Sequence, residues 1–235
     1  MNPDTLVAVS CYAGDVGQVT GNIEAYVHHQ TPVVIFSPED SPVDLPGWDC
    51  RHAGKRAYIG QDSLDRQRKY LEILLTYPHK YFLFNDSDSM CLSAEIPRYV
   101  YDSPDVVWSN EVVEPRPHAS SLPKIAMQPP YFLSRALIQR MVGVADRIVI
   151  HPITPYIDHY MLQLVCEAGI FHKNFLEAGE PWTKVNRMGE PWGESWGEMS
   201  GRVRYHGRVF VHPVKSSDHL HRLLAHHRAY AQEHP

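Results

Sequence analysis

Long apolar runs are missing from this chain of 235 residues. No stretch approaches the roughly 20 apolar residues that a membrane-spanning helix needs. The first four residues, Met-Asn-Pro-Asp, also lack the basic end and the apolar run of a secretory signal peptide. We therefore expect a soluble, cytoplasmic protein.

Cysteine is scarce and widely spread, at positions 11, 50, 91 and 166. This spacing excludes a CxxC metal or redox pair, and a chain of this size needs no disulfide framework, so we expect buried thiols. The GxGxxG fingerprint of dinucleotide-binding proteins is also missing, because Gly14, Gly17 and Gly21 make a GxxGxxxG pattern. An oxidoreductase is therefore set aside.

Basic residues are absent from the first fifty positions, which hold seven acidic residues. Over the whole chain, 22 Lys and Arg stand against 27 Asp and Glu, which gives a net charge of -5. This balance argues against unselective binding to nucleic acid or to anionic membranes. Basic residues gather in segments 51–80 and 201–235, and two such segments can meet at one anionic ligand.

Strand and helix patterns alternate along the first part of the chain. Apolar runs at 6–9 and 33–36 flank a candidate helix at 18–29, which is the pattern of a right-handed βαβ unit. We therefore expect an α/β fold with a Rossmann-like, mainly parallel central sheet flanked by helices. A strand at 81–84 and a further strand at 106–109 continue this pattern.

Further helices are expected on either side of these strands. A helix at 63–76 places leucines inward and Ser63, Arg66 and Tyr70 on a different, more polar face. Ser134 caps a helix that runs to residue 142. The remaining expectations are a proline-rich loop at 115–130, a helix at 156–168 ended by Gly169, an aromatic loop at 179–201, a strand or hairpin at 202–212 and a closing helix at 218–232.

The most informative stretch is an apolar strand that stops at two carboxylates. Tyr81-Phe82-Leu83-Phe84 is followed by Asn85-Asp86-Ser87-Asp88. Residues i and i+2 of an extended chain point the same way, so both acids can reach one hard cation such as Mg²⁺ or Mn²⁺. Ligands of open α/β sheets collect beyond the carboxyl ends of the strands, where this pair would lie.

The order of these features resembles the glycosyltransferases of the GT-A fold, whose DxD motif holds a divalent metal against a nucleotide-sugar diphosphate. Three later segments also resemble that family. Segment 128–134 is similar to its acceptor-side segment, and 155–161 to its xED segment, where Ile157 replaces the usual first acid and leaves Asp158. Segment 209–215 is similar to the late segment that supplies a histidine to the metal and a basic residue to the diphosphate.

This resemblance implies a single GT-A-like catalytic domain over 1–235, with a nucleotide-sugar-binding half at 1–110 and an acceptor-binding half at 111–235. It implies Mn²⁺ or Mg²⁺ as the cofactor and a UDP- or GDP-linked sugar as the donor. The implied metal ligands are Asp86, Asp88 and His212. The implied donor contacts are Ser10, Tyr12, Asp15, Ser37, Glu39, Arg66, Asp86 and Lys215.

The resemblance also implies roles in transfer to an acceptor hydroxyl. Asp158 is expected to act as the base that takes the acceptor proton, with inversion at the anomeric carbon. A divalent ion and Lys215 would neutralise the negative charge that develops on the departing nucleoside diphosphate. Tyr131, Trp182 and Trp196 are the expected acceptor contacts, and the acceptor is a glycan, a small molecule or a hydroxymethylated DNA base.

Several alternatives remain open from the sequence. Asp86 and Asp88 can form an Asx turn in solvent, Asp158 can cap a helix, and His206 rivals His212 as a ligand. The same residues also suit a metal-dependent phosphoesterase or nuclease, or a nucleotide-sugar-binding module without catalysis. Arg66 can equally belong to a solvated helix surface.

Overall fold

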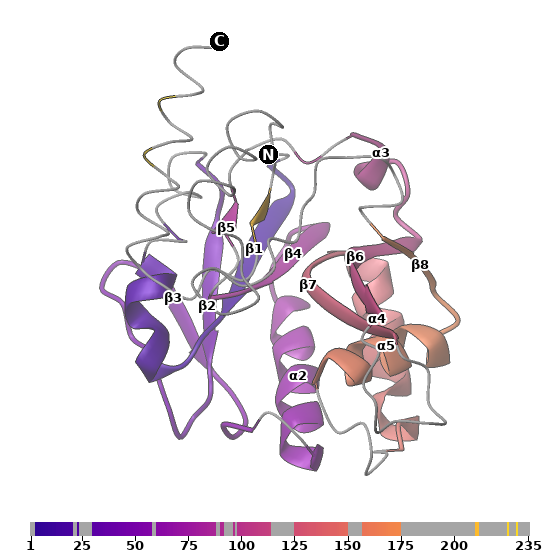
Figure 1. Ribbon diagram of the computed structural model, residues 1–235, viewed down its shortest axis with the longest axis horizontal. Helices are drawn as coiled ribbons and strands as arrows, with labels where there is room; N and C mark the ends of the chain where they lie inside the picture. Colours follow the sequence, from indigo (N-terminus) through magenta and orange to yellow (C-terminus); the bar gives the residue numbers. More distant parts are fainter. Residues whose placement is uncertain are drawn as a thin grey trace.

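The computed structural model describes residues 3–20, 23, 30–57, 60–87, 90–91, 96, 98–113, 125–149, 157–174, 210–211, 225 and 229. Seven of the strands in these residues form one sheet in the order β3-β2-β1-β4-β7-β6-β8 (Figure 1). The strands are β1 Thr5–Ser10, β2 Val33–Ser37, β3 Asp49–His52, β4 Tyr81–Asp86, β6 Val106–Val113, β7 Ile125–Ser134 and β8 Phe171–Asn174.

The sheet is mainly parallel. β1 pairs in parallel with β2 and β4, and β2 pairs in parallel with β3. β7 is the antiparallel strand, because it runs opposite to both of its neighbours, β4 and β6. β8 then pairs in parallel with β6. The expected α/β class and the parallel start of the sheet are confirmed.

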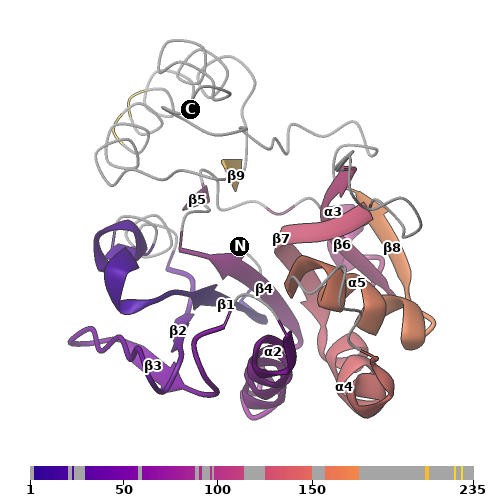
Figure 2. The same ribbon diagram turned by 60° about the horizontal axis from the view of Figure 1, so that its bottom comes forward.

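Helices cover both faces of this sheet (Figure 2). α2 Gly60–Leu74, α4 Arg135–Val144 and α5 Ile157–Glu167 lie on one face, and α3 Arg98–Tyr101 packs on the other. The short turn η1 Ala13–Asp15 and the helical residues 16–20 lie at the opposite end of the sheet from α3. A second short turn, η2 Ala145–Arg147, follows α4. Each face of the sheet has its own apolar core. Strands buried on both faces, such as β1 and β2, are therefore continuous apolar runs.

The ends of two helices match the expectations from the sequence. The Ser134 hydroxyl accepts a hydrogen bond from the amide of Leu137 at 3.3 Å, and thereby caps α4. Gly169 follows α5 with a φ of +61°, in the left-handed region that glycine adopts at little cost. The boundaries of α5 lie within one residue of those expected.

The expected polar face of α2 is wrong. Ser63, Arg66 and Tyr70 are 0%, 4% and 1% exposed, although each carries a polar group. The ring of Tyr70 stacks on Phe36 of β2 with a centroid separation of 4.6 Å. The sequence prediction used the apolar side chains to decide which side of α2 faces the protein. It therefore missed the polar stripe formed by Ser63, Arg66 and Tyr70, through which α2 also packs against the sheet.

The expected loop at 115–130 is also partly wrong, since β7 begins at Ile125 and contains a cis Pro129-Pro130 peptide. The pairing between β6 and β7 shifts register between Trp108 and Asn110, whose partners are Phe132 and Gln128. Proline lacks an N–H group and is accommodated in strands at such irregularities. Residues 114–124 lie outside the described part of the chain.

The cysteines differ from one another. Cys11 is buried, Cys50 is half-buried and Cys166 is exposed on α5, so the expectation of buried thiols is wrong for Cys166. Among the described helices, none is both long enough and apolar enough to cross a membrane. The proposed division into halves at residue 110 falls inside β6 and stays a prediction. Most of the segments expected at 179–201, 202–212 and 218–232 lie outside the described residues.

Candidate functional site

The carboxyl ends of β1, β2 and β4 meet at one edge of the sheet. Ser10 at the end of β1 pairs with Asp86 on one side and with Phe36 on the other. The amide of Ser87 donates to the carbonyl of Ser10 at 2.9 Å, which extends the contact one residue past β4. The first acid of the Asp-Ser-Asp motif is therefore half-exposed at the edge where open α/β sheets bind ligands.

A separate two-stranded pairing joins the segment after this motif to a segment late in the chain. β5 Met90–Cys91 pairs antiparallel with β9 Phe210–Val211, with Met90 opposite Val211 and Cys91 opposite Phe210. β5 begins two residues after Asp88, and β9 ends one residue before His212. The backbone segments adjacent to two expected metal ligands are thus hydrogen-bonded to each other, although Asp88 and His212 themselves lie outside the described residues.

Two arginines flank the Tyr12 ring just beyond β1. The guanidinium carbon of Arg56 lies 5.0 Å from the ring centroid, and that of Arg66 lies 5.5 Å from it. Arg66 is buried and donates from Nη1 to the carbonyl of Lys55 at 3.2 Å. None of the ion pairs between described residues includes Arg66. Burying a cation without a carboxylate partner is costly, so this site favours an anion.

Asp15 and Glu39 lie beside this cation cluster. The Ser87 hydroxyl lies 3.3 Å from a carboxylate oxygen of Asp15, and this contact joins the end of β4 to the turn after β1. The Glu39 amide donates to the carbonyl of Gly54 at 2.8 Å, and its exposed carboxylate lies 4.0 Å from Lys69. Glu39 also lines an open cavity of about 360 Å³ between the β3–α2 connection and the outer side of α2.

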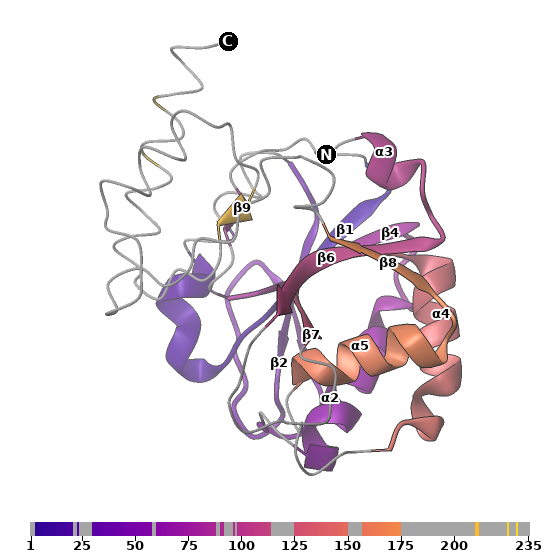
Figure 3. The same cartoon turned by 45° about the vertical axis from the view of Figure 1, so that its right-hand side comes forward.

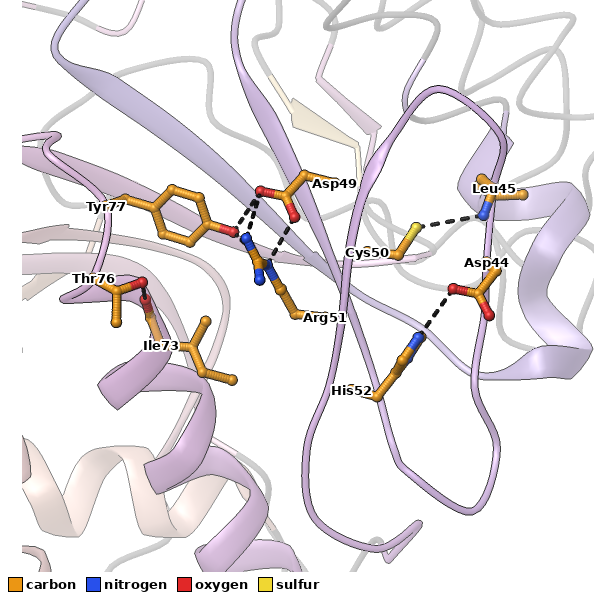
Figure 4. Close-up of polar contacts among 9 residues, drawn as sticks. All are labelled: Asp44, Leu45, Asp49, Cys50, Arg51, His52, Ile73, Thr76 and Tyr77. Atoms are coloured by element: carbon orange, nitrogen blue, oxygen red, sulfur yellow. Dashed lines mark hydrogen bonds and ion pairs between the residues drawn. The ribbon is translucent and has the colours of Figure 1, made fainter.

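Ser37, an expected donor contact, is an internal anchor in this structure. Its fully buried hydroxyl accepts from the amide of Val43 at 2.9 Å and lies 2.7 Å from Nδ1 of His52. Nε2 of His52 lies 3.1 Å from the exposed carboxylate of Asp44 (Figure 4). These bonds hold the segment after β2, and they use the hydrogen-bonding capacity of Ser37 inside the protein. The expected donor contact therefore has no support for Ser37.

The other side of β3 is tied to the end of α2. Figure 4 shows Asp49 and Arg51 directed towards Tyr77, whose hydroxyl donates to Asp49 at 2.6 Å and accepts from Nε of Arg51 at 3.1 Å. Burial and the bond to Asp49 raise the pKa of Tyr77 to about 12. These hydrogen bonds hold the edge strand β3, which leads to Gly54 and its contact with Arg66. They therefore support the site from outside it.

Asp158, the expected base, lies in the first turn of α5, and its side chain is outside the description. Two residues later, Tyr160 is fully buried beside the Gly60 backbone at the start of α2. Burial raises the pKa of Tyr160, and that backbone partly offsets the effect. The first turns of α5 and α2 are therefore neighbours, and α5 lies beneath β7 in Figure 3.

Tyr131, an expected acceptor contact, belongs to the core. It is 3% exposed, and its hydroxyl donates to the carbonyl of Met127 at 2.8 Å. Its ring packs near Phe84, so we do not retain it as an acceptor contact. The expectation relied on an exposed loop at this position, where the structure has the buried strand β7.

Five expected site residues lie outside the described part of the chain: Asp88, Trp182, Trp196, His212 and Lys215. Among the described residues, no group of three or more His, Cys, Asp or Glu side chains could hold a metal ion. The proposed carboxylate and imidazole ligands suit Mn²⁺ or Mg²⁺ by their chemistry, and Asp86 is the one of the three whose place is described.

Sequence reasoning missed two contributors to the site, Arg56 and Ser87. Arg56 is one of several basic residues in segment 51–80, and the contact of its guanidinium with Tyr12 depends on the path of the β3–α2 connection. Ser87 is the middle residue of the acidic motif, and the alternation of an extended chain gives a usable signal for it. Its hydroxyl lies within hydrogen-bond distance of Asp15.

Solved structures with a distantly similar chain path include those of two glycosyltransferases. One is a glycosyltransferase involved in glycosylation of the major capsid of PBCV-1, with a TM-score of 0.47 and 10% identity over 96% of this chain and 98% of that chain. The glycosyltransferase GlyE of Streptococcus pneumoniae TIGR4 has a TM-score of 0.48 and 8% identity, over 97% of this chain and 63% of GlyE. Its apo form gives a TM-score of 0.46 at the same identity and coverage.

Neither a protein-family model nor a curated protein sequence matches this chain. Likenesses as distant as those to the two solved proteins do not assign a family or an activity.

Proposed function

We propose that this protein is a metal-dependent glycosyltransferase that moves a sugar from a UDP- or GDP-linked donor to an acceptor hydroxyl. The β5–β9 pair carries the proposal, because it joins the backbone next to Asp88 to the backbone next to His212. The Asp-Ser-Asp segment and the His212 to Lys215 segment are 124 residues or more apart in sequence. A shared metal and diphosphate site requires such segments to meet.

The donor binds at the carboxyl edge of β1 and β4 in this proposal. Arg66 and Arg56 supply positive charge close to the Tyr12 ring, which suits the diphosphate. Ser10, Asp15 and Glu39 lie around the same edge and contact the ribose or the base. Lys215 adds a further cation to the diphosphate.

The proposed metal ligands are Asp86, Asp88 and His212, with Mn²⁺ or Mg²⁺ as the ion. When bound there, the ion supplies positive charge to the departing diphosphate. Asp86 has the position that this role needs, at the half-exposed end of β4. The arginines around Tyr12 act in the same direction, since they offset negative charge in a partly buried site.

Asp158 takes the proton of the acceptor hydroxyl in this proposal, and a base at that place implies inversion at the anomeric carbon. The neighbouring first turns of α5 and α2 support this role, because they place the Asp158 backbone on the side of the sheet that also carries Arg66. Trp182 and Trp196 are proposed acceptor contacts. The acceptor is a glycan, a small molecule or a hydroxymethylated DNA base.

A nucleotide-release assay tests the proposal. The protein is incubated with UDP- and GDP-sugars and Mn²⁺, and the wild type is expected to release UDP or GDP slowly. Asp158→Asn should reduce release by at least about 100-fold while donor binding is kept, because the amide cannot accept the proton. Glu167→Gln, at the other end of α5, is the matched control and should remain active.

Other results of this assay point elsewhere. Full activity of Asp158→Asn would remove the base assignment. Cleavage of a phosphodiester without sugar transfer would indicate a hydrolase, and binding without turnover would indicate a nucleotide-sugar-binding module. Absence of both binding and release would contradict the proposed function as a whole.

A further inference from the structure

Three polar side chains on the buried side of α2 have atoms without a hydrogen-bond partner within the described structure. They are the Ser63 hydroxyl, the Gln67 amide nitrogen and the Tyr70 hydroxyl, on residues that are 0%, 4% and 1% exposed. Buried polar groups in native proteins are nearly always paired with protein or with ordered water. Three such groups within two turns of one helix therefore mark a place where ordered water or a bound ligand would pair with them.

Residues 63, 67 and 70 follow the i, i+4, i+7 spacing and so lie on one side of α2. Tyr70 therefore shows which way Ser63 and Gln67 face. The Tyr70 ring stacks on Phe36 and lies 6.4 Å from the ring of Phe84, so the stripe faces the sheet. α2 joins the parallel strands β3 and β4 and runs opposite to them. Gln67 and Ser63 thus lie about one and two turns beyond Tyr70, towards the strand ends where Asp86 lies.

α5 contributes one further atom of the same kind, the Gln163 side-chain oxygen, which is buried without a hydrogen-bond partner in the described structure. The Tyr160 hydroxyl of α5 instead lies against the Gly60 backbone, three residues before Ser63, so it does not count as unpaired. α2 and α5 pack together on one face of the sheet (Figures 2 and 3). The unpaired groups of the two helices therefore lie on the same side of the sheet.

The unpaired groups of α2 and α5 differ in chemistry from the arginines around Tyr12. Hydroxyl and amide groups are neutral, and they both donate and accept hydrogen bonds. Arg56 and Arg66, by contrast, carry fixed positive charge. Neutral donors and acceptors in a buried place match the hydroxyl groups of a polyol, whereas guanidinium groups match phosphate.

We propose that Ser63 and Gln67 of α2 bind the hydroxyl groups of the sugar that the donor carries, and thereby determine which sugar is accepted. This inference rests on the proposed function, because the sugar enters as part of a nucleotide donor. A site that pairs its polar groups with substrate hydroxyls discriminates strongly against sugars that lack them, since those groups would then stay unpaired.

Gln67→Met tests this inference, because methionine has a similar length and lacks the orphaned amide. Removing an unpaired buried polar group should raise the Tm by about 2–4 °C. Calorimetry with Mn²⁺ then compares UDP, GDP, UDP-glucose and GDP-mannose. Affinity for the better-bound nucleotide-sugar should fall about tenfold, whereas affinity for its nucleoside diphosphate should stay unchanged. If Gln67→Met fails to fold, Ser63→Ala takes its place and should likewise lose affinity for the nucleotide-sugar but not for the nucleoside diphosphate.

Gln139→Met, on the exposed side of α4, is the matched control and should change none of these values. A lower Tm in Gln67→Met, or an equal effect on nucleotide-sugar and nucleoside diphosphate, would overturn the inference and make Gln67 a packing residue. Absence of nucleotide binding by the wild type would instead contradict the proposed function, and the sugar subsite with it.

Discussion

Arg66 shows how one residue can combine packing with a binding role. Its guanidinium is buried, contacts the Tyr12 ring and is held by the carbonyl of Lys55. Arginine is seldom fully buried unless it is paired, and the stem of this side chain packs against Gly54. The sequence indicated Arg66 as a donor contact through its place before the acidic strand, and the geometry adds the buried, unpaired charge that such a role needs.

Residue positions were predictable where an apolar run or a capping residue specifies them. For this reason Asp86 lies at the expected strand end and Ser134 at the expected helix start, while the metal-binding role of Asp86 stays a prediction. Ser37 and Tyr131 were misjudged, because their side chains are used inside the protein by Val43, His52 and Met127. These partners lie outside any local pattern.

The two thiols Cys11 and Cys166 are predicted to differ in reactivity. Burial, with smaller effects of Asp15 and Cys50, raises the pKa of Cys11 to about 12, which leaves about 10⁻⁴ of it as thiolate at pH 8. Iodoacetamide at pH 8 should therefore label the exposed Cys166 at least about 100-fold faster than Cys11, as measured by peptide mass spectrometry. Cys166→Ser should remove the fast label. Comparable labelling of both thiols in the folded protein would contradict this burial.

At the scale of elements, α2 links the sheet to the site. Its length and apolar residues were predictable from the sequence, and its start differs by three residues from the expected one. Its polar inner stripe was not predictable, because a pattern of apolar residues cannot show that Ser63 and Gln67 are buried as well. β7 shows the same limit, since its prolines indicated a loop and the structure places them in an irregular strand pairing.

The connection from β3 to α2 depends on Gly54. Its φ is +67°, and an added Cβ would lie 2.8 Å from the Cβ of Arg66 and 2.9 Å from its Cα. Gly54→Ala should therefore destabilise the protein by about 2–4 kcal/mol in urea unfolding, from backbone strain and overpacking together. It should also weaken nucleotide binding, because Arg66 must move.

Gly47→Ala is the matched control for this change. Gly47 has a φ of +85° but nothing within 4 Å of an added Cβ, so its variant carries the backbone strain without the clash. It should lose about 1–2 kcal/mol and leave nucleotide binding intact. An equal loss of unfolding free energy in the two variants would show that the close approach of Gly54 to Arg66 does not affect stability.

At the scale of the whole molecule, the site depends on contacts between distant segments. Its parallel half was predictable, because alternating strands and helices indicate βαβ units and their strand ends meet at one edge. The β5–β9 pair was not predictable, since it joins two short strands about 120 residues apart without a local signal of their pairing. This pair gives the proposed metal site its strongest structural support.

The most direct test of that site is a calorimetric titration of UDP and of GDP into the wild type and Asp86→Asn, each with and without Mn²⁺. The exposed Asp102→Asn serves as the control. We predict that one nucleotide binds the wild type at least about tenfold more tightly with Mn²⁺, and that Asp86→Asn loses this gain, because a carboxylate oxygen is the better ligand for a hard cation. Failure of both nucleotides to bind, or an affinity that Mn²⁺ and Asp86→Asn leave unchanged, would contradict the account.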